Sequence, residues 1–278
     1  MTSDGDELVV ARRFQGPPDC ANGGYVCGLL AARMAPGPLR VTLRRPVPLE
    51  RALGFEAVDG GGLALVVARS VTEQPSGLRS RSVAVTGGEP AHRGGKSSGS
   101  GSVAEPDGGE PLAVAVGCDL PDIGEIPQVG LEEARVLPLD ERLVSEHPFP
   151  DCFGCGPNRD RSDAVAISPR RLASGVYAAA WTPGPGLPHR PNGELAPECV
   201  WAALDCPSSF PAVPPGPPPH VLGRLEGDVR APILVGEEVV CVSWSLGGNG
   251  RKRYGASALL GPGGDVRAVA RATWIALE

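Results

Sequence analysis

Hydrophobic residues follow a helical pattern at two places along the chain. In residues 25–34 the apolar side chains are spaced to lie on one face of a helix. Residues 197–205 are apolar around nearly the whole helical circumference, as in a core helix. Pro197 suits the first turn of that helix, and Pro207 stops it. The pattern therefore predicts two helices, of which the second is buried.

Short segments rich in valine and leucine, separated by glycine and proline, follow each helix and predict strands. After the first helix they cover 39–47, 54–59, 63–71 and 78–85. After the second helix they cover 224–233, 237–246, 253–260 and 266–277. Further strands are expected at 8–14 and 112–117, and a hairpin is expected from 163–168 and 175–181. Each half thus contains a loop, a helix and then a set of strands, which indicates internal duplication.

Three short matches in the same order support the duplication. They align 22–31 with 196–205, 44–47 with 230–233, and 78–85 with 266–273. We therefore expect two units, at residues 1–87 and 112–278. The segment between them, 88–111, is rich in glycine and serine and poor in apolar residues, which predicts a flexible linker.

Charge and composition argue against several classes of protein. The net charge is −6 and the sequence has no basic stripe, so nucleic acid is not expected as a partner. No apolar run approaches the roughly 20 residues of a membrane span, and the acidic N-terminus lacks the apolar stretch of a signal peptide. We expect a cytoplasmic protein with its eight cysteines reduced. Its strong preference for arginine over lysine is typical of a high-GC bacterial genome.

Asp205 is the most unusual residue of the second predicted helix. A carboxylate in a core helix costs several kcal/mol unless it is paired or protonated. It also lies near the helix C-terminus, where the helix dipole is unfavourable for a negative charge. A catalytic role would account for this placement. A purely structural role, capping the turn that begins at Pro207, is the alternative.

Three motifs carry a resemblance to a known family. Asn22-Gly23-Gly24 at the start of a helix resembles the helix start of hotdog thioesterases. Asp205 resembles the acid that phenylacetate-pathway and 4-hydroxybenzoyl-CoA thioesterases carry on the corresponding helix. The turn at 152–157, Cys-Phe-Gly-Cys-Gly-Pro, resembles one in bacterial hotdog thioesterase-like proteins. The resemblance implies an α+β fold, a tandem (double) hotdog in which each curved antiparallel sheet wraps a central helix.

The resemblance also implies hydrolysis of an acyl thioester at one composite site between the two hotdogs. The first half has the glycines but Ala31 in place of the acid, whereas the second half has Asp205 but Pro197-Glu198 in place of the glycines. Antiparallel helices would bring one complete set together. The expected site residues are Asp205 as base or nucleophile, Gly23 and Gly24 as amide donors to the oxyanion, Asn22, Ser209 as a water-positioning hydroxyl, and Glu198 as a second carboxylate.

The expected ligand is a small-molecule acyl-CoA or an acyl-carrier thioester, with CoA as part of the substrate and no separate cofactor. Arg251, Lys252 and Arg253 form the densest basic run and could bind the CoA phosphates. The fused halves could stand alone or pair again as a homodimer. A non-catalytic acyl-CoA-binding pseudo-enzyme is the alternative function, because the second helix starts with Pro-Glu and the second acid is missing.

Metal binding has less support in the sequence. Cys152-x-x-Cys155 together with His147 resembles part of a zinc site, but a second cysteine pair with matching spacing is absent. Cys206, beside Asp205, is interpreted as a small buried cysteine. We therefore expect no metal.

Overall fold

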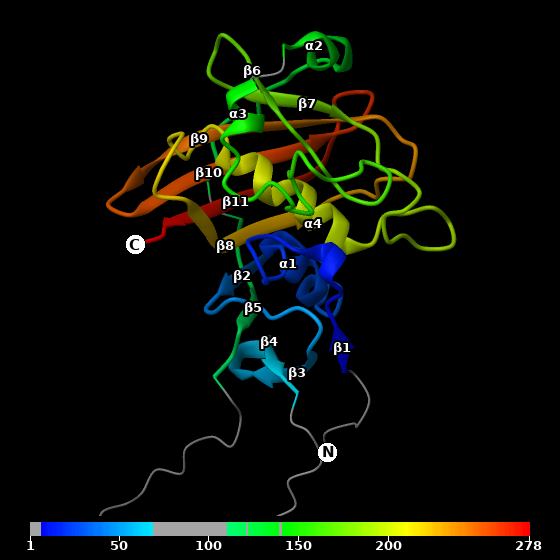
Figure 1. The fold of residues 1–278 in the computed structure, drawn as a ribbon. Helices are drawn as coiled ribbons and strands as arrows, with labels where there is room; N and C mark the ends of the chain where they lie inside the picture. Colours follow the sequence, from blue (N-terminus) through cyan, green and yellow to red (C-terminus); the bar gives the residue numbers. More distant parts are fainter. Residues whose placement is uncertain (1–6, 69–109, 121, 139–140) are drawn as a thin grey trace, which may run out of the picture.

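The computed structural model describes residues 7–68, 110–120, 122–138 and 141–278 (Figure 1). The strand predicted at 78–85 and residues 88–109 of the predicted linker lie outside the described residues. Among the residues that are described, none of the helices combines the length and the apolar character needed to cross a membrane.

The described strands form one antiparallel sheet in the order β1-β3-β4-β5-β2-β8-β11-β10-β9-β7-β6. The front half of the chain supplies β1 (Leu8–Val9), β2 (Leu39–Leu43), β3 (Ala52–Val58), β4 (Gly62–Val67) and the adjoining β5 (Ala113–Gly117). The back half supplies β6 (Arg170–Arg171), β7 (Tyr177–Trp181), β8 (His220–Val229), β9 (Val239–Asn249), β10 (Lys252–Leu260) and β11 (Val266–Ala276). The two groups join where β2 pairs with β8, with Leu39 opposite Gly227.

Most of the predicted strands are present, with three differences. β5 pairs with β2 and β4, so the strand expected to open the second unit extends the sheet of the first. The strand predicted at 8–14 ends at Val9, and a short 3-10 helix follows at Arg12–Phe14. The predicted strand at 163–168 is wrong, because Ala166 and Ile167 donate their N–H groups to the carbonyls of residues 153 and 154 instead of to a neighbouring strand.

Two helices, α1 (Gly23–Ala31) and α4 (Pro197–Asp205), lie side by side on the sheet (Figure 1). α1 contacts β2, β4, β5 and β8, and α4 contacts β8, β10 and β11. Their apolar residues join one hydrophobic core that draws on both halves of the chain. α1 starts two residues earlier than predicted, because the side chain of Asn22 caps it.

The two helices run antiparallel and their backbones touch. A Cβ atom on Gly24 would lie 2.4 Å from Cβ of Asp205, and one on Gly28 would lie 2.2 Å from Cα of Glu198. Both distances are far below van der Waals contact, so the two glycines of α1 are needed for this close packing. The start of α1 therefore meets the end of α4, and the end of α1 meets the start of α4.

Two short helices, α2 (Leu131–Val136) and α3 (Glu141–Ser145), lie in the segment between β5 and β6. Residues of 120–137 pack on the other face of the sheet, in a second apolar cluster with Trp244. The indole N–H of Trp244 donates to the carbonyl of Ile123 at 2.9 Å. This segment therefore covers the outer face of the back half.

Candidate active site

Asp205 lies where the start of α1 meets the end of α4. Its side chain is buried, with the residue only 2 % exposed. Carboxylate oxygen Oδ2 accepts hydrogen bonds from the backbone N–H of Gly24 at 2.8 Å and from Nδ2 of Asn22 at 3.3 Å. Oδ1 has no hydrogen-bond partner among the described residues. The acid of the back half is thus held by the front half, and its second oxygen is buried without a hydrogen-bond partner among the described residues.

The surroundings of Asp205 compensate for its place at the wrong end of α4. The N-terminus of α1 supplies a backbone N–H and the positive end of its helix dipole. These interactions do not remove the whole cost of burial. Burial raises the pKa of Asp205 to about 7, although the hydrogen bonds from Gly24 and Asn22 favour the charged form.

Asn22 connects the helix cap to the acid. Its Oδ1 accepts the backbone N–H of Tyr25 at 2.8 Å, which is the usual N-cap interaction. Because Oδ1 is engaged in the cap, Nδ2 is directed at Asp205 and at the sulfur atoms of Cys152 and Cys206, each at 3.6 Å. One buried amide thus fixes the start of α1 and orients the carboxylate.

Serine hydroxyls satisfy the last carbonyls of α4 and the turn that follows. Ser208 donates to the carbonyl of Asp205 at 2.6 Å and accepts the indole N–H of Trp274 at 2.9 Å. Ser257 donates to the carbonyl of Leu204, and Ser209 donates to that of Cys206 at 2.8 Å. These bonds hold Asp205 in place without touching its carboxylate. Ser208 was not among the predicted site residues, although a serine three residues after the last helical residue is a recognisable signal.

A cavity of about 1120 Å³ opens beside the acid. Of the predicted site residues, Asn22, Gly23, Asp205 and Ser209 line it. Most of the remaining wall is apolar and comes from β2, β8, β11, the segment 146–149 and the proline-rich segment 213–219. A space of this size and character suits an apolar ligand that carries one reactive polar group.

Gly23 and Gly24 differ in what their N–H groups do. The N–H of Gly24 donates to Asp205, so it is already engaged. The N–H of Gly23, in the first turn of α1, has no hydrogen-bond partner among the described residues, and Gly23 lines the cavity. The free donor of the predicted pair is therefore Gly23.

The structure does not bring the other predicted residues to the acid. Glu198 is seven residues before Asp205 on α4, about 10 Å away along the axis, and it is not one of the residues lining the cavity. Arg251, Lys252 and Arg253 are also outside the lining. They lie near its rim, since Lys252 pairs with Ile275, which lines the cavity, and Arg251 donates to the carbonyl of Ala276.

Two further features of the cavity were not expected. His220 lies in its wall, with Nδ1 at 3.0 Å from the carbonyl of Pro218 and Nε2 buried without a partner among the described residues. Burial lowers the pKa of this imidazole. In addition, the sulfur atoms of Cys152, Cys155 and Cys206 all lie within 4.8 Å of one another. No local signal in the sequence could link Cys206 to the other two cysteines, because 51 residues separate it from Cys155.

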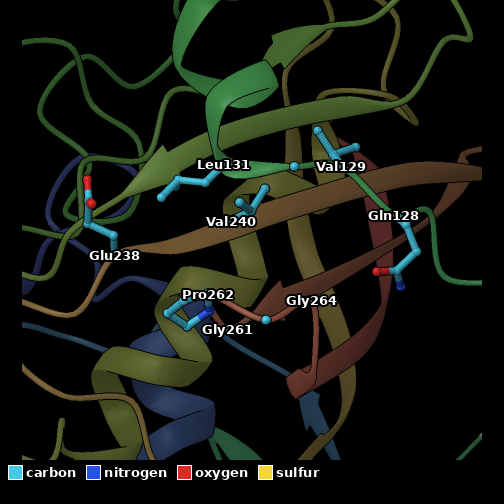
Figure 2. A pocket seen from close by; sticks show the side chains of 10 residues that line it. Gln128, Val129, Leu131, Glu238, Val240, Gly261, Pro262 and Gly264 are labelled. Carbon is cyan, nitrogen blue, oxygen red and sulfur yellow. The ribbon is translucent and has the colours of Figure 1, made fainter.

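A second, smaller cavity of about 310 Å³ lies at the outer face of the sheet (Figure 2). Residues 128–131, Glu238 and Val240, and the turn 261–264 line it. Glu238 is the only ionisable residue among those lining residues, and its carboxylate is paired with Arg135. The larger cavity is therefore the better candidate for chemistry.

Comparison with known proteins supports the fold. No protein-family model matches the chain, and no curated protein matches its sequence. A TesB protein of Mycobacterium avium subsp. paratuberculosis superimposes with a TM-score of 0.52 at 10% identity, over 98% of this chain and 92% of the other. A candidate thioesterase II of Thermobifida fusca YX gives 0.53 at 12% identity, again over 98% and 92%. The chain shares the overall fold of these two proteins along nearly its whole length.

Proposed function

We propose that the chain is a tandem hotdog that hydrolyses acyl thioesters at the junction of α1 and α4. The observation that carries this proposal is the 2.8 Å hydrogen bond from the Gly24 N–H to Oδ2 of Asp205. It joins a helix start from the front half to an acid from the back half, beside a large apolar cavity. The fold shared with the TesB protein and the candidate thioesterase II is consistent with this assignment.

Asp205 acts as general base or as nucleophile through Oδ1, the oxygen that has no partner among the described residues. As base, it takes a proton from water while the water oxygen bonds to the carbonyl carbon of the thioester. The C–S bond then breaks, and the proton passes from Asp205 to the departing thiolate. A pKa of about 7 suits a group that must both accept and return a proton near neutral pH.

The developing oxyanion needs a donor that is free before the reaction. The N–H of Gly23 lies in the first turn of α1, where the helix dipole favours negative charge, and it borders the cavity. Gly24 and Asn22 instead orient the acid. The hydroxyl of Ser209 also borders the cavity, and its oxygen is able to accept a hydrogen bond from the attacking water.

The acyl chain occupies the apolar part of the cavity. The carrier extends past the rim formed by β11, toward the cationic side chains of Arg251, Lys252 and Arg253. In CoA and in an acyl carrier protein alike, the pantetheine arm that carries the thioester ends in a phosphate group. The basic run therefore suits either carrier.

The test is release of free thiol from a panel of acyl-CoAs that differ in chain length and polarity. Asp205→Asn keeps the shape of the side chain but removes the base, and we expect a loss in kcat/KM of about 10²- to 10⁴-fold. Glu198→Gln is the matched control, because Glu198 carries the other carboxylate of α4 and does not line the cavity. It should retain wild-type rates within about twofold. Equal rates for wild type and Asp205→Asn would contradict the proposal.

One observation favours a second function, a non-catalytic acyl-CoA-binding protein. The Gly24 N–H, one of two predicted oxyanion donors, is already taken by Asp205. In that case acyl-CoAs would raise the melting temperature of both wild type and Asp205→Asn, and neither protein would release thiol. Thiol release by the wild type but not by Asp205→Asn would exclude a function limited to binding.

A further inference from the structure

Three cysteine thiols meet at one wall of the large cavity. Cys152 and Cys155 come from the turn before β6, and Cys206 follows the last residue of α4. The sulfur atoms of Cys152 and Cys206 are 3.7 Å apart, and all three sulfur atoms lie within 4.8 Å of one another. All three residues line the cavity. The sequence alone showed only the first two.

These distances match those expected around a metal ion. Zinc binds thiolate sulfur at about 2.3 Å in tetrahedral geometry, which puts neighbouring sulfur atoms about 3.8 Å apart. The 3.7 Å between Cys152 and Cys206 fits this spacing, and the 4.8 Å limit allows Cys155 to complete a triangle with small side-chain adjustments. A disulfide would instead require the two sulfur atoms to approach to about 2.05 Å.

The turn that carries Cys152 and Cys155 is sterically fixed. A Cβ atom on Gly154 would lie 2.6 Å from the sulfur of Cys206, and one on Gly156 would lie 2.4 Å from the carbonyl oxygen of Pro150. Only glycine fits at position 156, where the clash is with backbone, and a side chain at position 154 would displace the sulfur of Cys206. Phe153, between the two cysteines, is fully buried against Phe14 and Tyr25 of the front half. The turn is thus anchored independently of its sulfur atoms.

N–H donors from neighbouring residues face the sulfur atoms. Nδ2 of Asn22 lies 3.6 Å from the sulfur atoms of both Cys152 and Cys206. Nε2 of His147 lies 3.3 Å from the sulfur of Cys155. Nδ1 of His147 accepts the N–H of Phe149, so the neutral ring carries its proton on Nε2 and donates to sulfur. Such donors stabilise thiolates, which are the metal-binding form of cysteine.

A cation is needed if these groups are thiolates. Three negative charges next to Asp205, two of them buried, would repel one another and the carboxylate, at a cost of several kcal/mol for each buried charge without a compensating charge. A divalent ion at the centre of the three sulfur atoms supplies that charge. The fourth position of a tetrahedral ion has no candidate ligand in the sulfur cluster itself, so it is open to water or to a ligand in the cavity.

We propose that Cys152, Cys155 and Cys206 form a three-thiolate site for a thiophilic divalent cation of the zinc class, beside Asp205. Binding releases the three thiol protons to solvent and ties the 152–156 turn to the end of α4. The proposal does not depend on thioester hydrolysis, since a binding protein could carry the same site.

The test uses the whole chain, purified without chelators and with reductant. We expect about one equivalent of zinc per chain by elemental analysis. Cobalt loaded in its place should give thiolate-to-cobalt charge-transfer absorption and the d–d bands of a tetrahedral ion. Cys155→Ser and Cys206→Ser should lower the bound metal by about tenfold or more. Cys241→Ser is the matched control for Cys206→Ser, because Cys241 is also buried and its thiol donates to a backbone carbonyl that a serine hydroxyl can also reach.

Two outcomes would overturn the proposal. One is wild-type protein that neither retains zinc nor shows thiolate-to-cobalt absorption after cobalt is added. The other is a Cys152–Cys206 disulfide, seen as a mass about 2 Da lower that reductant restores. The cobalt spectrum of the wild type does not depend on the variants, so the test stands even if one of them fails to fold.

Discussion

The two ends of the α1–α4 pair are packed alike but differ in their chemistry. At the acid end, formed by Asn22, Gly23, Gly24 and Asp205, a glycine lets the backbones touch. At the opposite end, where Gly28 meets Glu198, a glycine does the same. Only the acid end has a side chain that caps the incoming helix, since Ala196 gives α4 no side-chain cap and Pro197 has no N–H to donate.

This difference separates the requirements of packing from those of chemistry. Close approach of two antiparallel helices needs small residues at both crossing points, and both ends retain them. A reactive site also needs free donors, an acid and space, and those meet at the acid end beside the cavity. In the tandem fold that we propose, the two crossing points keep the same packing, whereas the acid, the free donor and the cavity meet at one of them alone.

The largest expected effect comes from adding one methyl group at each crossing point. Gly24→Ala and Gly28→Ala should each lower the free energy of unfolding by about 3 kcal/mol, because the added Cβ meets backbone that cannot move aside. Gly24→Ala should also lower kcat per folded molecule about 100-fold, since it displaces Asp205 by a large fraction of an ångström. Gly28→Ala should leave kcat per folded molecule unchanged. Urea unfolding and assays at low temperature measure both.

Gly117→Ala is the control for this pair, because a Cβ there meets no atom within 4 Å. It should leave stability and rate near wild type. An equal loss of kcat in Gly24→Ala and Gly28→Ala would mean that the two ends do not differ in the way proposed.

The second prediction concerns pH and distinguishes the two carboxylates of α4. Asp205 must be ionised to act as base, and in protein freed of metal by a chelator burial raises its pKa to about 7. The rate should therefore fall about tenfold for each pH unit below 7 and level off above it. Glu198→Gln should show the same profile. A flat profile between pH 5 and 8 in a folded, active protein would contradict the assignment of Asp205.

Stability gives an independent check on the same titration. Because the folded-state pKa of Asp205 is above its unfolded value, the folded protein binds the extra proton between about pH 4 and 7. This contribution to stability is present at low pH and is lost as pH rises through 7. Relative to Asp205→Asn, the wild type should lose about 1.4 kcal/mol of unfolding free energy between pH 6 and 8. Denaturant unfolding of both proteins at pH 6 and 8 measures it.

The sequence predicted the parts of this comparison that depend on local signals. Asn22-Gly-Gly and Pro197 mark helix starts, and Asp205 was conspicuous because a charge in an apolar helix needs a partner. The resemblance to hotdog thioesterases then predicted that the two helices lie antiparallel, with Asn22-Gly-Gly beside Asp205. Gly28 lies four residues after Gly24, on the same face of the helix, and Ser208 lies three residues after Asp205. Both spacings can be read from the sequence, but the importance of the two residues depends on which faces of α1 and α4 are in contact.

Other features depend on contacts between distant parts of the chain. Cys206 meets Cys152 and Cys155 only because the end of α4 reaches the 152–156 turn. β5 joins the front half through pairing with β2 and β4, which its position in the sequence does not reveal. Periodicity reports which residues are buried, but not which buried residues meet.

The smallest expected effect separates the two roles of Asn22. Asn22→Ser keeps an oxygen that can cap α1 but removes the amide that donates to Asp205. The lost hydrogen bond favours the charged acid, so its removal should move the midpoint of the pH–rate profile upward by less than about one unit. The melting temperature should change little.

Asn22→Asp sharpens this prediction, because it also keeps the cap but places a second carboxylate against Asp205. Repulsion between the two acids should move the midpoint further upward than in Asn22→Ser. If both variants instead keep the wild-type midpoint, the Asn22 amide serves only the helix cap and the sulfur atoms beside it. Orientation of Asp205 would then depend on the Gly24 N–H alone, and the difference between the two ends of the helix pair would reduce to one backbone donor and one acid.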